Sequence, residues 1–314
     1  MIEPRLKYVP CPGPAAARAP SSGAHRMAFW DWGGAAEPAA AGHVIVCVHG
    51  LSRQGRDFDT LARALAGQAR VICPDVAGRG HSDWLADPAG YQIPQYAADM
   101  VALLAQLHAE SPIHTLDWVG TSMGGLIGLV LAGQAGLPLP APVRRLVLND
   151  VGPALEPQAL QRIGQYLGVA AHYSSPEQAA DALWKDSQGF GPHTPKQWLQ
   201  LSRPMLRPVP QGGFVLHYDP AIAVPFRAVT PQLAAAGEQL LWQLYDQVTA
   251  RVLLLRGAQS DLLSPQTAQA MQQRGPRARL VQFDGVGHAP TLVDPAQVAV
   301  VQRFLLGEGG AGEP

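Results

Sequence analysis

Hydrophobic residues in this chain occur in short continuous runs that alternate with longer stretches in which they recur every three or four positions. A short run rich in β-branched residues is typical of a strand buried on both faces of a sheet. The longer recurrence is typical of a helix with one apolar face. The expected strands cover 43–48, 71–73, 115–119, 143–148, 251–256 and 280–283, and the expected helices cover 57–66, 93–107, 126–131, 265–274 and 295–306.

The order of these elements predicts the class of the fold. Strands that alternate with helices form βαβ units with right-handed crossovers, so we expect an α/β fold with a mainly parallel sheet. Two further strand-like pieces, 6–9 and 27–32, precede the alternation. We expect these two pieces to form an antiparallel edge that leads into the main sheet.

The alternation stops between about Pro153 and Ala236. This stretch holds amphipathic helical pieces separated by prolines, together with several aromatic residues. So large an insertion without a βαβ pattern predicts a helical cap over one end of the sheet. The expected division is a core of residues 1–152 and 237–314 and a cap of residues 153–236. Most of the aromatics would form the small core of the cap, and one or two would line a pocket.

Length, composition and charge limit the class of protein. A chain of 314 residues with 47% hydrophobic and 15% charged residues buries a large core, and one domain with an insertion is favoured over two domains. The formal net charge is −1, and no basic cluster occurs. Charge therefore gives no reason to expect nucleic acid or an anionic membrane as a partner.

The cysteines and the N-terminal residues predict a cytoplasmic location. Cys11, Cys47 and Cys73 are widely spaced, and two of them lie inside apolar runs, which is typical of reduced, buried thiols. The first residues lack the charged and apolar regions of a signal peptide. No apolar run approaches the roughly 18 residues that a membrane span needs.

One motif joins a predicted strand to a predicted helix. The stretch Gly120-Thr121-Ser122-Met123-Gly124 has the pattern Gly-x-Ser-x-Gly. A strand that turns into a helix this abruptly has strained backbone, and glycines suit it because a Cβ would collide with neighbouring backbone. The motif predicts that Ser122 is a nucleophile at the tip of the turn, beside the N–H groups of a helix N-terminus. The alternative is that Ser122 merely caps the helix.

A serine nucleophile needs a base, usually a histidine that is oriented by a carboxylate. His288 follows a strand and a glycine-flanked loop, so we expect it at the edge where the carboxyl ends of the strands meet. Two carboxylates also follow strands: Asp150 before the predicted cap and Asp261 after it. We favour Asp261, because the order Ser122, Asp261, His288 is the order expected with this type of turn.

Several sequence features together resemble the α/β-hydrolases that carry a cap, and the similarity covers about residues 27–306. The features are His49-Gly50 after a strand, Asp75-x-x-Gly78-x-Gly80-x-Ser82, Gly120-Thr121-Ser122-Met123-Gly124-Gly125, Asp261 and Gly287-His288. The resemblance implies a mainly parallel eight-stranded sheet flanked by helices, with an inserted helical cap.

The same resemblance implies roles for further residues. The backbone N–H groups of Met123 and Leu51 would form the oxyanion hole, and His49 would brace its loop. The glycines at 78 and 80 would form a turn that braces the fold, because their spacing does not fit a dinucleotide-binding loop. No His-Glu-x-x-His or paired Cys-x-x-Cys pattern occurs, so we expect no metal and no cofactor.

The resemblance also implies the reaction. Ser122 stands where dehalogenases and epoxide hydrolases have an aspartate. We therefore expect a carboxylesterase-like serine hydrolase that cleaves a small-molecule ester through an acyl-enzyme, as a monomer or homodimer. Carbon–carbon bond hydrolases of the meta-cleavage type typically have Asn before the nucleophile and Trp after the histidine, where this chain has Thr121 and Ala289. Lactonases, thioesterases, cofactor-free perhydrolases and low-turnover ligand receptors are the alternatives on the same fold.

Overall fold

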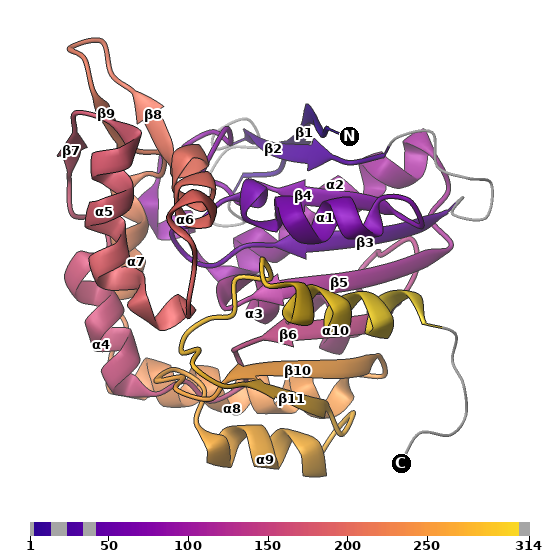
Figure 1. Cartoon of the computed structure of the whole chain (residues 1–314). Helices are drawn as coiled ribbons and strands as arrows, with labels where there is room; N and C mark the ends of the chain where they lie inside the picture. Colours follow the sequence, from indigo (N-terminus) through magenta and orange to yellow (C-terminus); the bar gives the residue numbers. More distant parts are fainter. Residues whose placement is uncertain (1–2, 14–23, 34–41, 308–314) are drawn as a thin grey trace.

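A computed structural model describes residues 3–13, 24–33 and 42–307 and centres on one sheet of eight strands (Figure 1). The strands are β1 (Arg5–Cys11), β2 (His25–Asp31), β3 (His43–Val48), β4 (Arg70–Pro74), β5 (Thr115–Thr121), β6 (Val143–Asn149), β10 (Arg251–Gly257) and β11 (Arg279–Phe283). Their order in the sheet is β1-β2-β4-β3-β5-β6-β10-β11, and every neighbouring pair from β4 to β11 is parallel. The predicted mainly parallel eight-stranded sheet is confirmed.

β1 and β2 form the antiparallel edge that the sequence predicts. Tyr8 faces Ala28 and Cys11 faces His25 across the pair, and β2 pairs antiparallel with β4 on its other side. Of these two strands β1 lies at the edge of the sheet, and its residues are accordingly more exposed than those of β2. The hairpin therefore ties the start of the chain to the parallel part of the sheet.

Helices cover both faces of the sheet (Figure 1). The helices are α1 (Asp59–Leu65), α2 (Ile93–Glu110), α3 (Met123–Gly133), α8 (Pro231–Gln247), α9 (Pro265–Gln273) and α10 (Pro295–Leu306). On one face, Leu61 of α1 and Val301 of α10 belong to one hydrophobic core. On the other face, Leu103 of α2 and Ile127 of α3 belong to a larger core, against which α8 also packs.

The segment between β6 and α8 is the one that the sequence predicts to be a helical cap. Its elements are α4 (Pro157–Tyr166), β7 (His172–Tyr173), α5 (Pro176–Ser187), α6 (Pro195–Ser202), β8 (Leu206–Pro208), β9 (Phe214–Leu216) and α7 (Ala223–Arg227). The three strands form a small antiparallel sheet that the sequence did not predict, because two or three residues are too few to show a period of two. The predicted boundary at residue 236 falls inside α8, and the division into core and cap stays a prediction.

The cysteines match the sequence-based expectation, since Cys11, Cys47 and Cys73 are free, buried thiols in β1, β3 and β4. Within the described ranges, none of the helices combines the length and the apolar character that a membrane crossing requires.

His49 joins two loops at the edge of the sheet where the strands end. It follows β3 and is fully buried. Its Nε2 accepts a hydrogen bond from the backbone N–H of Val76 at 2.9 Å, so its Nδ1 carries the proton and donates to the carbonyl of Gly50 at 2.7 Å. Burial lowers the pKa of His49 to about 3, and the ring is therefore neutral. His49 acts as the brace that the resemblance implies.

A buried neutral histidine makes stability depend on pH. The unfolded chain has a histidine pKa of about 6.5, so below that pH the unfolded state binds the proton and the folded state does not. We expect the free energy of unfolding to fall between pH 6.5 and about 3, by up to about 1.4 kcal/mol per pH unit from His49. His49→Gln removes this contribution and flattens the slope, as measured by urea unfolding at pH 7, 6 and 5. The control is His114→Gln at an exposed site, which should keep the wild-type slope.

Candidate active site

Ser122 stands at a corner between β5 and α3 where the backbone is strained. Its φ is +51° and its ψ is −116°, a combination that costs a non-glycine residue about 1–3 kcal/mol. A Cβ on Gly120 would lie 2.2 Å from the carbonyl oxygen of Gly124, and one on Gly124 would lie 2.0 Å from that of Val48. Only glycine fits such contacts. The resulting close approach of α3 to β5 and β3 holds Ser122 at the tip of the turn.

The hydroxyl of Ser122 is directed at an imidazole and not at the helix. Its Oγ lies 3.0 Å from Nε2 of His288. The side chain makes no capping hydrogen bond to α3, so the alternative reading of Ser122 as a helix cap is wrong. The backbone N–H of Ser122 donates separately to the carbonyl of Asn149 at 3.0 Å, which leaves the hydroxyl for the imidazole.

His288 connects Ser122 to a buried carboxylate. Its Nδ1 lies 2.8 Å from Oδ2 of Asp150, which is fully buried. A carboxylate accepts and does not donate, so the ring carries its proton on Nδ1 and offers the lone pair of Nε2 to the Ser122 hydroxyl. A hydroxyl, an imidazole and a carboxylate in this chain of hydrogen bonds form the arrangement that raises the nucleophilicity of a serine.

Asp150 is fixed by donors on both of its carboxylate oxygens. Oδ1 accepts from the backbone N–H of Gly257 at 2.9 Å, and Oδ2 accepts from the hydroxyl of Ser260 at 2.6 Å. The backbone N–H of Asp150 donates to the carbonyl of Leu255 at 2.8 Å. A buried carboxylate needs such donors in place of water. Those from β10 and the turn after it hold Asp150 toward His288.

The structure corrects the carboxylate that the sequence favoured. Asp261 has 47% of its side chain exposed, and its Oδ2 lies 2.7 Å from Nε of Arg162 in α4. It therefore joins the predicted cap to the sheet and does not orient His288. β6 and β10 are neighbouring parallel strands, so Asp150 and the turn at 260–261 reach the same edge. That turn presents Ser260 inward and Asp261 outward.

The structure brings the two residues predicted for the oxyanion hole close to Ser122. Met123 follows Ser122 and begins α3, so its N–H has no acceptor inside the helix. The loop that holds Leu51 is close as well, because a Cβ on Gly50 would lie 3.7 Å from the Cβ of Ser122. These positions fit the predicted role of Met123 and Leu51, which stays a prediction.

Arg79 is a buried residue of this site that the sequence did not single out. Its Nε donates to the carbonyl of Leu51 at 2.8 Å, and its Nη2 lies 3.7 Å from Sδ of Met123. A positive charge therefore lies close to both residues of the predicted oxyanion hole, where it would favour a developing negative charge. In the sequence this position is marked by its two flanking glycines, Gly78 and Gly80. In the structure both glycines have a positive φ.

The predicted cap contacts the loop that carries His288. The backbone N–H of Gly287 donates to the carbonyl of Gly189 at 2.6 Å. On the other side of His288, Nε2 of His193 lies 2.8 Å from the hydroxyl of Thr291. The two contacts flank His288, so residues 189–193 help to position the loop of the imidazole.

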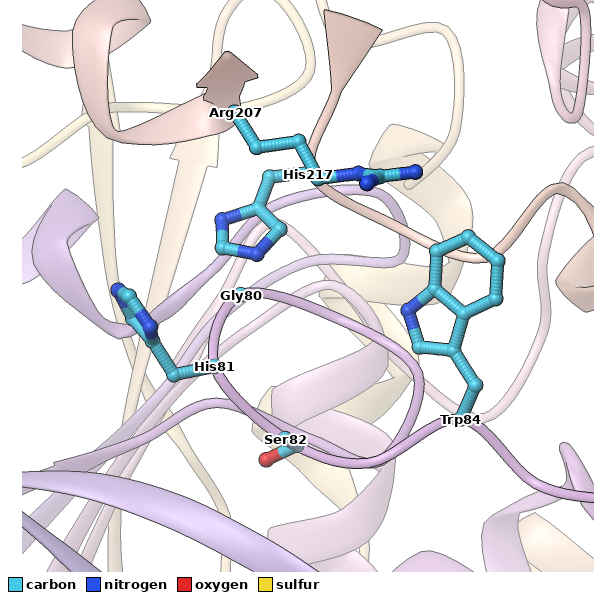
Figure 2. Close-up of a pocket in the computed structure, with 6 residues that line it drawn as sticks. All are labelled: Gly80, His81, Ser82, Trp84, Arg207 and His217. Atoms are coloured by element: carbon cyan, nitrogen blue, oxygen red, sulfur yellow. The ribbon is translucent and has the colours of Figure 1, made fainter. Parts of the chain in front are cut away.

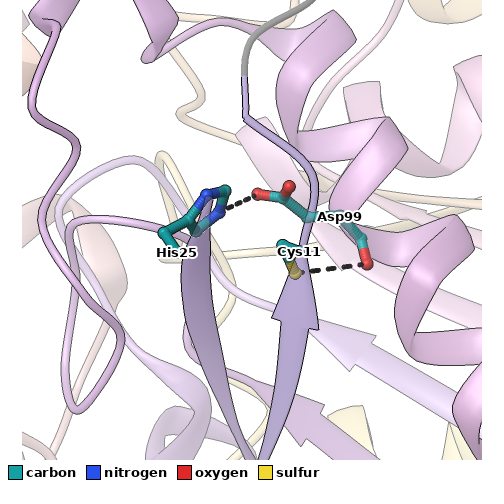
Figure 3. A group of neighbouring side chains, drawn as sticks. All are labelled: Cys11, His25 and Asp99. Atoms are coloured by element: carbon teal, nitrogen blue, oxygen red, sulfur yellow. Dashed lines mark hydrogen bonds and ion pairs between the residues drawn. The ribbon is translucent and has the colours of Figure 1, made fainter. Parts of the chain in front are cut away.

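A separate group of donor atoms lies at the end of the β1–β2 pair where Cys11 faces His25 (Figure 3). Cys11, His25 and Asp99 are buried, and their donor atoms lie within 4.8 Å of one another. Nε2 of His25 lies 3.0 Å from Oδ2 of Asp99, and Gln95 donates to Oδ1 at 2.7 Å. Burial, followed by the charge of Asp99, raises the pKa of the Cys11 thiol, and a protonated thiol is a poor metal ligand. We interpret the group as a clamp that joins β1 and β2 to α2.

Known proteins resemble this chain in sequence and in fold. Residues 43–295 match the protein family of the alpha/beta hydrolase fold. The 3-hydroxybutyrate-oligomer hydrolase of Cupriavidus necator is 51% identical over 308 residues, which are 97% of this chain and 98% of that protein. A solved alpha/beta hydrolase from Novosphingobium aromaticivorans is 35% identical, with a TM-score of 0.80 over 97% of this chain and 99% of its own. The pimeloyl-(acyl-carrier protein) methyl ester esterase of Photobacterium profundum is 26% identical over 84% of this chain and 95% of its own.

Substitution of the two candidate carboxylates distinguishes their roles. Asp150→Asn keeps the shape of the side chain but lets His288 adopt the wrong tautomer, so we expect kcat for p-nitrophenyl butyrate to fall about 1,000- to 10,000-fold. Asp261→Asn removes an exposed ion pair, and we expect kcat within about twofold of wild type. Steady-state kinetics on both variants measure this. A large loss in Asp261→Asn with a small one in Asp150→Asn would restore the sequence-based assignment.

Ser260 provides a test of how firmly Asp150 must be held. Ser260→Ala removes the 2.6 Å hydrogen bond to the carboxylate and leaves the one from Gly257, so we expect kcat to fall about tenfold with KM nearly unchanged. Ser260→Thr retains a hydroxyl and should recover most of that loss. The measurement is kcat and KM for the same ester, with the melting temperature of each variant as a control for folding. An unchanged kcat in Ser260→Ala would contradict a positioning role.

Proposed function

Since the chain belongs to the alpha/beta hydrolase fold family and is a hydrolase of ester bonds, we propose that its substrates are oligomers of 3-hydroxybutyrate. The observation that carries this choice is the identity of 51% with the Cupriavidus necator enzyme, which extends over 97% of this chain. The likeness therefore includes the segment between β6 and α8, where substrate preference is expected to reside, as well as the sheet.

In the proposed first step, His288 takes the proton of Ser122 as its oxygen attacks the ester carbonyl. The N–H groups of Met123 and Leu51 stabilise the oxyanion, and loss of one such donor typically costs about 100- to 1,000-fold in rate. His288 then gives its proton to the oxygen that leaves, which in these oligomers is the hydroxyl of the next unit. The Ser122 acyl-enzyme remains.

In the second step, the same imidazole removes a proton from water, and the hydroxide attacks the acyl-enzyme. Collapse of the tetrahedral intermediate returns the proton to Ser122 and releases the acid. Asp150 accepts a hydrogen bond from the Nδ1–H group throughout and stabilises the imidazolium that forms in each step. The role that the sequence assigned to Asp261 therefore passes to Asp150.

The residues around Ser122 help to distinguish between the alternative reactions on this fold. The residue before the nucleophile is Thr121, whose hydroxyl accepts a hydrogen bond from the side-chain amide of Asn149 at 2.9 Å. It thus has a structural partner and replaces the asparagine that is typical of meta-cleavage hydrolases. Lactones and thioesters present the same acyl carbon to Ser122 and are the closest competing substrates.

Release of monomer from defined oligomers tests the proposal. Purified protein incubated with the dimer and trimer of 3-hydroxybutyrate should release the free hydroxyacid, measured by chromatography. Ser122→Ala should lower the rate by about 10,000-fold or more while the melting temperature stays close to that of wild type. Matched reactions with p-nitrophenyl butyrate, a lactone, a thioester and a vinylogous 1,5-diketone rank the alternatives. Turnover of p-nitrophenyl butyrate without any release from the oligomers would contradict the proposed substrate class.

A further inference from the structure

A pocket of about 400 Å³ lies where the small sheet of the predicted cap meets the loop after β4 (Figure 2). Figure 2 shows Arg207 reaching across it toward Trp84, with the imidazoles of His81 and His217 on the other side. It is lined by Gly80, His81, Ser82, Trp84, Arg207 and His217. None of these residues belongs to the Ser122, His288 and Asp150 group.

Arg207 has a charge without a counterpart. In the described part of the chain, its guanidinium makes neither an ion pair nor a hydrogen bond, and its Nε is buried. Its only defined partner there is the ring of Trp84, whose centroid lies 5.5 Å from the guanidinium carbon. A buried donor without an acceptor is costly, so the site lacks a group that accepts.

None of the side chains that line the pocket balances the positive charge of Arg207. None of the lining residues is acidic. Burial, together with the nearby His81 and Arg207, lowers the pKa of His217 to about 4, so the ring is neutral at pH 7. On the far side of Trp84, a second pocket contains Asp83, which is paired with Arg26 at 3.2 Å. Arg26 is thus paired with a carboxylate of the protein, whereas Arg207 has no such partner among the described residues.

The pocket shares a loop with the active site. The backbone N–H of Gly80 donates to the carbonyl of His217 at 2.9 Å, and Arg79 forms a bridge with Tyr218. Arg79 points its side chain to Leu51, whereas the next residues of the loop line the pocket. A single loop therefore separates two sites, one on each side.

We propose that this pocket binds a small organic carboxylate through the guanidinium of Arg207. A planar guanidinium matches a carboxylate with two parallel hydrogen bonds, and Trp84 supplies an apolar wall for the carbon chain. The volume is ample for a four-carbon acid. The choice of 3-hydroxybutyrate as the acid rests on the proposed function, because hydrolysis would release it beside this loop.

Calorimetric titration of the full chain carrying Ser122→Ala tests binding apart from turnover. The probes are 3-hydroxybutyrate, butyrate, methyl 3-hydroxybutyrate and inorganic phosphate. We expect saturable binding of both carboxylates, at least tenfold weaker binding of the methyl ester, and loss of carboxylate binding by at least tenfold in Arg207→Gln. The matched control is Arg203→Gln, which removes an exposed arginine paired with Glu177 and should leave affinity unchanged.

The outcomes separate this inference from the proposed function. Equal affinity for the carboxylate and its methyl ester, equal affinity in Arg207→Gln, or binding of phosphate alone would overturn it. Butyrate binding that depends on Arg207 supports the site even if the wild-type protein leaves 3-hydroxybutyrate oligomers intact. In that case the proposed substrate fails while the carboxylate site stands.

Discussion

The close packing of α3 against the ends of β3 and β5 is the constraint on which the site depends. At Gly120 and Gly124 the backbones approach so nearly that no side-chain carbon fits between them. This approach forces the turn at Ser122 into a strained conformation, and packing on both sides keeps it there. The reactive hydroxyl is thus placed by buried backbone and not by its own hydrogen bonds.

Much of this arrangement was predictable from the sequence because parallel strands carry a strong signal. Their buried runs end at the same edge of the sheet, so residues that follow each run converge there without knowledge of the loops. His288 was chosen on that basis and Ser122 from its Gly-x-Ser-x-Gly motif, and the structure places them in hydrogen-bond contact. The antiparallel edge of β1 and β2 was predicted from two short strand-like runs, and the bracing role of His49 was implied by the family resemblance; the structure agrees with both.

The hydrophobic pattern could not identify the carboxylate that orients His288. Two acidic residues follow neighbouring strands, and the difference between them is the direction in which one turn presents its side chains. Asp261 is paired with Arg162, which is 99 positions away in the sequence and lies in α4, within the predicted cap. The short strands β7, β8 and β9 and the unpaired Arg207 also depend on contacts between distant segments, which a local period cannot reveal.

The hydrogen-bonded groups of the site are contributed by residues 122, 150 and 288, and the imidazole comes last. During translation the N-terminal part of a polypeptide leaves the ribosome first. A growing chain that has completed β5, α3 and β6 therefore contains the hydroxyl and the carboxylate without the base between them. His288 follows β11, so the hydroxyl of Ser122 has its base only when that last strand has joined the sheet.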